Sequence, residues 1–128
     1  MTPVRLVPGD DLRNALLRHA GVEGAFVLSG IGSLAAAAIR FAGRPDVEML
    51  TGPLEIVSLA GTLTPNGAHL HVVVSDGTGR VTGGHVGAGC IVRTTVEALV
   101  ASVAGYRLSR EPDPRTGYAE LVVRRDEA

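Results

Sequence analysis

The chain has no lysine and no tryptophan, a single cysteine, and aromatic residues at only 3% of its 128 positions. Because a disulfide needs two cysteines, Cys90 cannot form one within the chain, which favours a reducing compartment. We therefore expect a cytoplasmic location. The scarcity of aromatic side chains excludes the stacking platform that proteins use to bind single-stranded nucleic acid.

An excess of charge of one sign is also missing. Twelve arginines oppose 13 acidic residues, which gives a net charge of -1, and the arginines are scattered along the chain. A domain that binds DNA by itself normally has a basic footprint, so we expect little affinity for DNA from this domain alone. The longest unbroken apolar stretches, such as residues 34–39, are far below the roughly 20 residues of a membrane-spanning helix. We expect no membrane association.

The length and the 45% hydrophobic content predict one domain over residues 1–128, large enough to fold without disulfides or a structural metal. Asp10 or Asp11 can cap a helix over about residues 10–20, in which leucines and alanines share one face. The apolar run over residues 24–29 predicts a buried strand. Residues 33–38 stay ambiguous, because the four alanines favour a helix whereas a strand after a bulge fits equally well.

From residue 47 onward the pattern is typical of β-strands. Two segments rich in branched residues, 54–63 and 68–75, are separated by the turn residues Thr-Pro-Asn-Gly and predict a hairpin. A second turn over residues 76–79 leads into a strand over residues 80–86.

The last third of the chain is harder to interpret. Residues 90–103 are apolar without a decisive period, which leaves both helix and strand open. Residues 109–117 are polar and contain two prolines, so we predict a loop there. Alternation over residues 118–123 predicts a final strand.

Three of the four histidines fall within residues 69–85. His69 and His71 project from the same side of a strand, about 7 Å apart. A turn with an odd number of residues, for which Gly79 in the left-handed conformation is suited, pairs Ser75 with Val81 and brings His71 opposite His85. A turn of two or four residues places His85 on the other face.

Three neutral imidazoles with an open fourth position are typical of catalytic zinc sites, and the same donors suit iron(II), nickel or manganese. We therefore predict a divalent metal, zinc before the others, held by His69, His71 and His85. Such a site can polarise a carbonyl, and Glu55 is the candidate carboxylate that orients a ligand or moves a proton. Cys90 is predicted to be a small buried residue rather than a fourth ligand. The alternative is that the histidines occupy a half-exposed sheet face without a function.

Several segments resemble the domain conserved in plants and prokaryotes, the PPC domain. The main one runs from Leu70-His-Val-Val-Val-Ser-Asp-Gly-Thr-Gly to Gly83-Gly-His85, and Gly89-Cys-Ile-Val-Arg-Thr-Thr-Val-Glu97 follows it. Residues 9–12, 30–34, 54–61 and 116–118 agree in the same order, so the resemblance spans nearly the whole chain. It implies an α+β domain with a largely antiparallel or mixed β-sheet and few flanking helices, assembled as a homotrimer. It also implies strands over residues 35–41 and 94–103.

The fold of this family is similar to that of acetolactate decarboxylase, whose zinc is held by a His-x-His pair and a third histidine after Gly-Gly. His69, His71 and His85 match those positions. Bacterial members of the family are commonly labelled DNA-binding by extension from plant proteins, which carry the domain beside AT-hooks. Only Gly43-Arg-Pro45 echoes an AT-hook here.

The resemblance and the histidine pattern together leave two hypotheses on the function. The first is a stand-alone homotrimer that holds a divalent metal and is either a small-molecule-binding module or a metal-dependent enzyme. The alternative is a DNA-associated, transcription-related domain that acts through partners.

Overall fold

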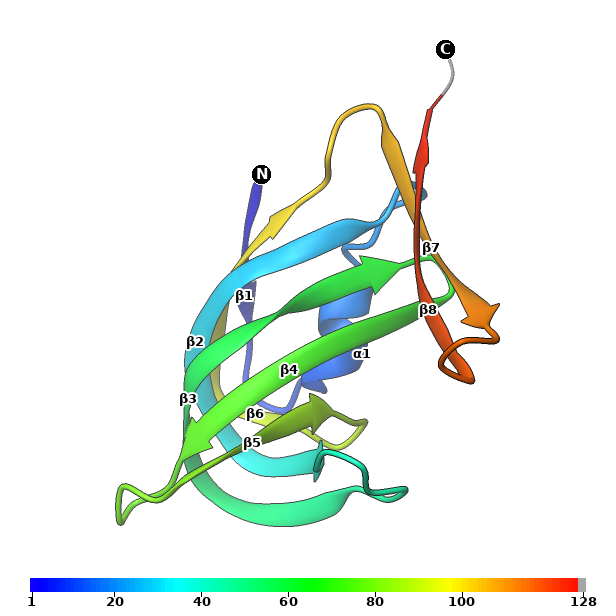
Figure 1. Cartoon of the computed structure of the whole chain (residues 1–128). Helices are drawn as coiled ribbons and strands as arrows, with labels where there is room; N and C mark the ends of the chain where they lie inside the picture. Colours follow the sequence, from blue (N-terminus) through cyan, green and yellow to red (C-terminus); the bar gives the residue numbers. More distant parts are fainter. Residues whose placement is uncertain (127–128) are drawn as a thin grey trace.

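The structure is a computed structural model that describes residues 1–126 (Figure 1). In this range the chain forms one short helix, α1 (Leu12–Leu17), and eight strands. The strands are β1 (Thr2–Leu6), β2 (Ala25–Arg40), β3 (Glu48–Thr64), β4 (Gly67–Ser75), β5 (Val81–Val86), β6 (Ile91–Ala101), β7 (Tyr106–Asp113) and β8 (Tyr118–Arg125). The predicted α+β class with a largely antiparallel sheet is confirmed.

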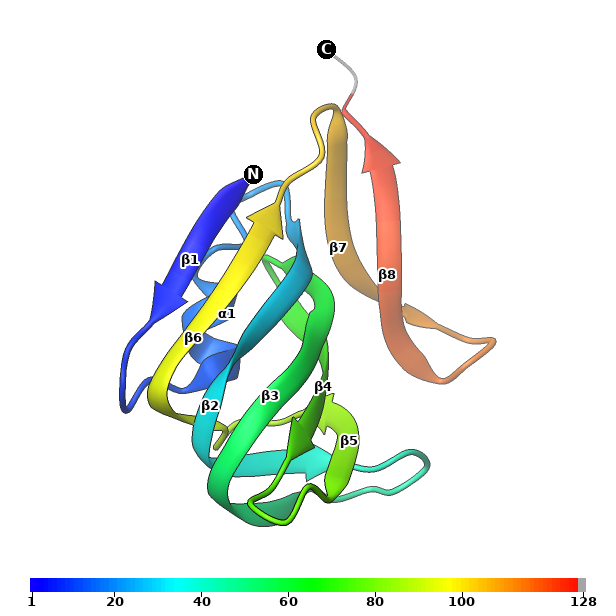
Figure 2. The ribbon, with the colours of Figure 1, turned by 90° about the vertical axis from the view of Figure 1, so that its left-hand side faces the viewer.

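Six strands form one antiparallel sheet in the order β1-β6-β2-β3-β4-β5. The far end of β2 also pairs with β5, through Ile39 with Val86 and Arg40 with His85. This second pairing joins the edge strand back to the middle of the sheet, and the sheet therefore curls strongly (Figure 2). The small helix α1 packs against β3 and β4, with Leu12 and Leu16 fully buried.

The long strand β2 can bend because it contains irregularities and glycine. Its pairing with β6 shifts register near residues 27–29, 32–34 and 34–36. At Gly32 a Cβ atom would lie only 2.3 Å from the carbonyl oxygen of Thr95, so only glycine fits there. The glycine-rich segment over residues 30–34 therefore serves the bend of the strand.

The two segments that the resemblance assigned to strands are strands. The alanines of residues 35–38 lie in β2, and β6 covers residues 91–101. Ala36 pairs with Thr51 of β3 on one side and with Ile91 of β6 on the other. Pairing on both sides supplies backbone hydrogen bonds and burial that outweigh the helix propensity of alanine.

The helix is shorter than predicted. Asp11 is the N-cap residue, and its carboxylate accepts hydrogen bonds from the backbone N–H of Asn14 and of Gly89. The helix ends at Leu17 rather than near residue 20. His19 and Ala20 donate to the carbonyl oxygens three residues earlier, so the chain closes in a tighter turn after the helix.

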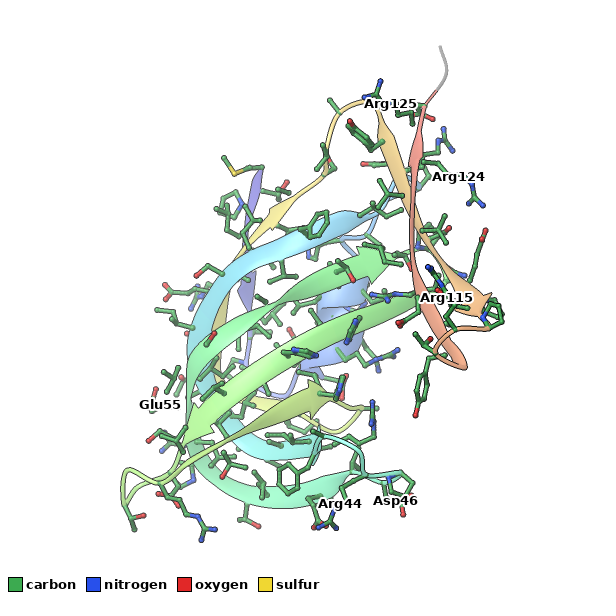
Figure 3. All side chains as sticks on the ribbon, in the orientation of Figure 1. Arg44, Asp46, Glu55, Arg115, Arg124 and Arg125 are labelled. Atoms are coloured by element: carbon green, nitrogen blue, oxygen red, sulfur yellow. The ribbon has the colours of Figure 1, made fainter. Side chains whose placement is uncertain are left out.

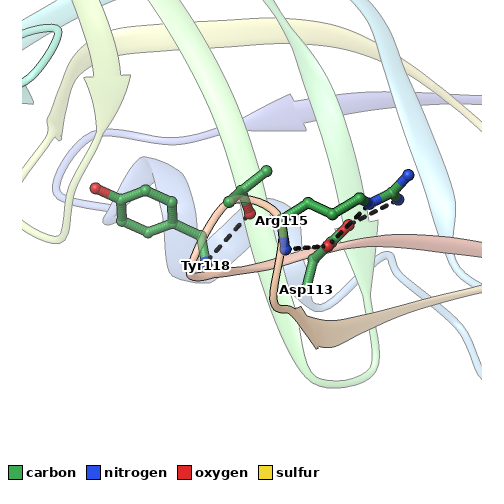
Figure 4. Close-up of polar contacts among 4 residues, drawn as sticks. Asp113, Arg115 and Tyr118 are labelled. Atoms are coloured by element: carbon green, nitrogen blue, oxygen red, sulfur yellow. Dashed lines mark hydrogen bonds and ion pairs between the residues drawn. The ribbon is translucent and has the colours of Figure 1, made fainter.

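The predicted loop over residues 109–117 is wrong for its first half. Residues 109–113 belong to β7, which pairs with β8 in a separate two-stranded hairpin. Pro112 is compatible with this strand because β7 is an edge strand that pairs on one side in the described part of the chain. The true turn covers residues 114–117, where Asp113 accepts from the backbone and side chain of Arg115 (Figure 4). The sequence pattern also predicted no strand at the position of β1.

The turn between β4 and β5 has the odd count that the sequence favoured. Asp76 donates its N–H to the carbonyl oxygen of Arg80 at 3.0 Å, which leaves three residues, 77–79, at the tip. Gly79 has a φ of 83°, in the left-handed region. Ser75 consequently pairs with Val81, and His71 pairs with His85.

No helix within residues 1–126 combines the length and the hydropathy needed to cross a membrane.

We predict that Gly79→Ala lowers the free energy of unfolding by about 1 kcal/mol, because a Cβ atom in the left-handed region is strained against its own backbone. Gly77→Ala is the matched control, since Gly77 lies in the same turn without a positive φ and nothing lies within 4 Å of its Cβ position. Urea unfolding of both variants measures the difference. Equal losses in the two variants would contradict this interpretation of the turn.

Candidate metal centre

The three histidines converge on one face of the sheet. His71 of β4 pairs with His85 of β5, and His69 lies two residues along β4 on the same face. The Nε2 atoms of His69 and His71 are 3.2 Å apart, and one ring nitrogen from each histidine lies within 4.8 Å of the other two. The sequence prediction that these three side chains meet is therefore confirmed.

Alternation along β4 explains why the rings point away from the core. Leu70 and Val72 are buried against the helix side of the sheet, so His69 and His71 face outward. His71 is exposed, whereas His69 and His85 are partly buried. The cluster is therefore open to a ligand on its outer side.

Gly84 places His85 by allowing two strands to approach closely. A Cβ atom at Gly84 would lie 2.7 Å from the carbonyl oxygen of Arg40, and one at Gly83 would lie 2.9 Å from that of Val72. The sequence left open whether this glycine pair admits a ligand or a tight backbone. The structure shows that the backbones of β2 and β4 occupy the space.

The separation of His69 and His71 fits a tetrahedral metal. Two nitrogens bound to zinc at 2.0–2.1 Å in a tetrahedron lie about 3.3 Å apart. The Nε2 atoms of His69 and His71 already have nearly this separation, at 3.2 Å. A distance of 3.2 Å also suits a hydrogen bond between neutral rings. The hydrogen bond requires a proton on one of the two facing nitrogens, whereas binding of a metal by both rings requires that neither nitrogen carries one.

The surroundings favour neutral imidazoles. Burial lowers the pKa of His69 below its ordinary value, and the positive charge of Arg110 and the neighbouring histidines lower it further. Burial lowers the pKa of His85 as well, and Arg40 and His71 add to the effect. Because only an unprotonated ring nitrogen can bind a metal, both shifts favour the form that acts as a ligand.

The other predicted site residue, Glu55, is not brought to the cluster. It is an exposed residue of β3 opposite Ser75, which lies four residues from His71 along β4, a separation of about 13 Å. Figure 3 shows Glu55 at the left of the view and Arg115, in the turn of the β7–β8 hairpin, at the right. Cys90 is fully buried, and its Sγ atom contacts the backbone of Ala38, as predicted for a small buried residue.

Two hollows meet at His69, between the sheet and the β7–β8 hairpin. One has a volume of about 610 Å³ and the other of about 600 Å³, and Arg110 and Glu120 line both. Arg40 and His85 complete the first hollow. The sequence did not reveal Arg40, Arg110 and Glu120 as site residues, because only the docking of the hairpin and the β2–β5 pairing bring them to the histidines.

The backbone of the hairpin is hydrogen-bonded to the rest of the domain at two points, Asn66 and Glu23. Asn66, in the turn before β4, donates from Nδ2 to the carbonyl oxygen of Arg110 at 2.6 Å and accepts from its N–H at 2.9 Å. The N–H of Leu108 donates to the carbonyl oxygen of Glu23 at 2.8 Å, and the Leu108 side chain is buried. These contacts fix Arg110, whose guanidinium donates to the hydroxyl of Thr62, the residue opposite His69.

We predict that Asn66→Ala loosens the hairpin, because both hydrogen bonds to the Arg110 backbone are lost. Hydrogen exchange at the Arg110 amide should accelerate about fivefold, from roughly 1 kcal/mol for a hydrogen bond of this kind. Asn14→Ala, an exposed position on α1, is the matched control. If the rate of hydrogen exchange is unchanged at the Arg110 amide but altered at the amides of β4, Asn66 supports the sheet rather than the hairpin.

The sequence matches the Plants and Prokaryotes Conserved (PCC) domain over residues 2–104. The chain therefore belongs to this family, as its motifs indicated. All three histidines fall inside the matched region, and β7 and β8 fall outside it.

Among solved structures, a hypothetical protein from Salmonella is 37% identical, with a TM-score of 0.92 over 97% of this chain and 92% of the other. A metal-containing protein from Archaeoglobus fulgidus is 27% identical, with a TM-score of 0.78 over 94% of this chain and 91% of the other. A protein from Ralstonia eutropha JMP134, named as a candidate for DNA binding, is 25% identical. Its TM-score is 0.80 over 94% of this chain and 89% of the other.

Among curated proteins, a bifunctional protein GlmU from Synechococcus sp. (strain JA-3-3Ab) is 46% identical over 124 residues. The match covers 94% of this chain but only 20% of the GlmU protein. The chain thus spans about a fifth of the length of this relative.

Proposed function

We propose that the chain holds a divalent metal, zinc before iron(II), nickel or manganese, through His69, His71 and His85, and takes a small-molecule ligand on the open side of this site. The observation that carries the proposal is the convergence of three ring nitrogens within 4.8 Å on an accessible face. The name of the Archaeoglobus relative, a metal-containing protein of the same fold, supports it.

A bound divalent metal supplies a Lewis-acidic centre with coordination positions left for a ligand. The residues of the chain then have separate roles. The three histidines hold the metal, and the hollows beside them admit the ligand. Glu120 lines both hollows and is the carboxylate placed to exchange a proton with a ligand there, whereas Glu55 lies on a distant part of the sheet. A binding module and a metal-dependent enzyme both use this arrangement.

We predict that untagged protein, purified without chelator, carries near one metal per chain by elemental analysis, and that a His71→Ala/His85→Ala double variant carries none. Loss of two of three ligands removes the chelate that makes binding tight. His19→Ala is the control, because His19 is exposed and lies outside the cluster. Circular dichroism establishes that each variant is folded. Protein that takes up no metal, even after reconstitution with zinc or iron(II), overturns the proposal.

The alternative function, association with DNA through partners, is supported by the name given to the Ralstonia relative. The net charge of -1 opposes direct binding. This alternative predicts a DNA affinity that falls steeply with salt concentration and does not change when a chelator is added. It also predicts that the His71→Ala/His85→Ala variant binds DNA as well as the wild type, and these results would favour it over the metal proposal.

The expected homotrimer is part of the same proposal. Large apolar side chains are exposed on the outer face of the sheet, among them Ile31 at 53% and Val57 at 57%. These two residues are neighbours across β2 and β3, because Gly32 pairs with Ile56. Exposed apolar residues that lie together are typical of surfaces between subunits.

We predict that light scattering gives the mass of three chains for the wild type and a smaller mass for Ile31→Glu, since a charge would be buried without a partner between subunits. Val22→Glu is the matched control, as Val22 is 74% exposed in the turn before β2. A wild type that runs as a monomer contradicts the trimer and leaves the metal proposal standing.

A further inference from the structure

Two arginines flank the three-histidine cluster from opposite sides. Arg40 pairs directly with His85 through the backbone of β2 and β5, so the two residues are cross-strand neighbours. Arg110 is held on the other side by Thr62, the residue that pairs with His69. Both arginines line the 610 Å³ hollow together with His69 and His85. The β2–β5 pairing and the docked hairpin thus place the positive charges of Arg40 and Arg110 beside the open side of the cluster.

Neither guanidinium forms an ion pair within the described part of the chain. The ion pairs within residues 1–126 join Arg107 to Asp126, Arg115 to Asp113 and Arg124 to Glu111. Arg40 donates from Nη1 to the carbonyl oxygen of Arg44 at 3.1 Å. Arg110 uses Nη2 for Thr62, and its buried Nε has no hydrogen-bond partner in the described residues. A guanidinium has five N–H groups, so most of the donors of both residues stay available.

One carboxylate lies in the same hollow, that of Glu120. It forms no ion pair with Arg40 or Arg110 in the described range. Even if its charge offsets one arginine, the second arginine and a divalent metal bound by neutral rings leave a net positive site. A ligand that carries negative charge would therefore be favoured over a neutral one.

The size and the donor geometry narrow the class of ligand. A hollow of about 610 Å³ is in the range of small-molecule sites. The planar fork of arginine matches the oxygens of a carboxylate or a phosphate group, which it can bind through two parallel hydrogen bonds.

We infer that the ligand of the three-histidine site is a small anion with a carboxylate or phosphate group, and that Arg40 and Arg110 bind this group. The inference rests on the proposed function and adds the class of ligand to it. Arg110 belongs to β7, outside the region that matches the PCC domain. The hairpin therefore contributes part of the ligand specificity, and the family domain contributes the three histidines.

The test begins with protein loaded with cobalt(II), whose visible absorption reports changes in coordination. Cobalt content is measured first for the wild type and for each variant. Acetate and phosphate are then titrated separately at constant ionic strength, and the two arms decide between a carboxylate and a phosphate ligand. We expect a saturable spectral change in the wild type with at least one of these anions.

Arg110→Met and Arg40→Met should each weaken this binding about tenfold or more, with cobalt content unchanged. Arg110→Lys keeps the charge and should recover part of the affinity, which a purely structural role of Arg110 would not predict. Arg124→Met is the matched control, because Arg124 lies on the same hairpin, pairs with Glu111 and lines neither hollow. Figure 3 shows Arg124 near the C-terminal end of β8.

The outcomes separate the two levels of the proposal. Full cobalt uptake without saturable anion binding, or with equal affinity in Arg110→Met, Arg40→Met and Arg124→Met, overturns the anion inference and leaves the metal site intact. A wild type that takes up no cobalt overturns the metal site and this inference together. If Arg110→Met does not fold, Arg40→Met and Arg110→Lys still decide the question.

Discussion

The pairing of β5 with both β4 and β2 is the constraint on which the rest of the site depends. It closes the sheet at one end, and in the same few residues it sets His85 beside His71 and Arg40 beside His85. Both contacts need the glycine pair before His85, because a side chain at Gly84 would collide with the backbone of β2. The same strand pairings therefore close the sheet and bring the histidines together.

The hairpin supplies the second layer of the site. It forms a sheet of its own, and a two-stranded sheet is only marginally stable by itself. Its attachment through Asn66 and Leu108 is what turns an open histidine cluster into a cleft with Arg110 and Glu120 on its wall. The family domain thus provides candidate ligands for a metal, and the C-terminal hairpin adds groups that can recognise what approaches it.

Much of this could be predicted from the sequence, for reasons that are local. Side-chain alternation placed His69 and His71 on one face, and the left-handed preference of glycine at position 79 fixed the odd turn that brings His85 to them. The alanine stretch was ambiguous because propensity and pairing oppose each other there, and only the family resemblance decided it correctly. The polar composition of residues 109–113 hid strand β7, since an edge strand tolerates charges and proline. Glu55 lies in an apolar run, and the family resemblance favoured a site role for it, but its position relative to the histidines depends on the register of β3, which composition does not reveal.

The most direct test of the central claim is X-ray absorption at the zinc edge of zinc-loaded, untagged protein. Binding through His69, His71 and His85 predicts low-coordinate zinc with about three imidazole ligands at 2.0–2.1 Å and the outer-shell scattering of histidine rings, lost in the double histidine variant. A spectrum without imidazole scattering, or with a sulfur ligand, would contradict it and leave the histidine cluster without its proposed metal.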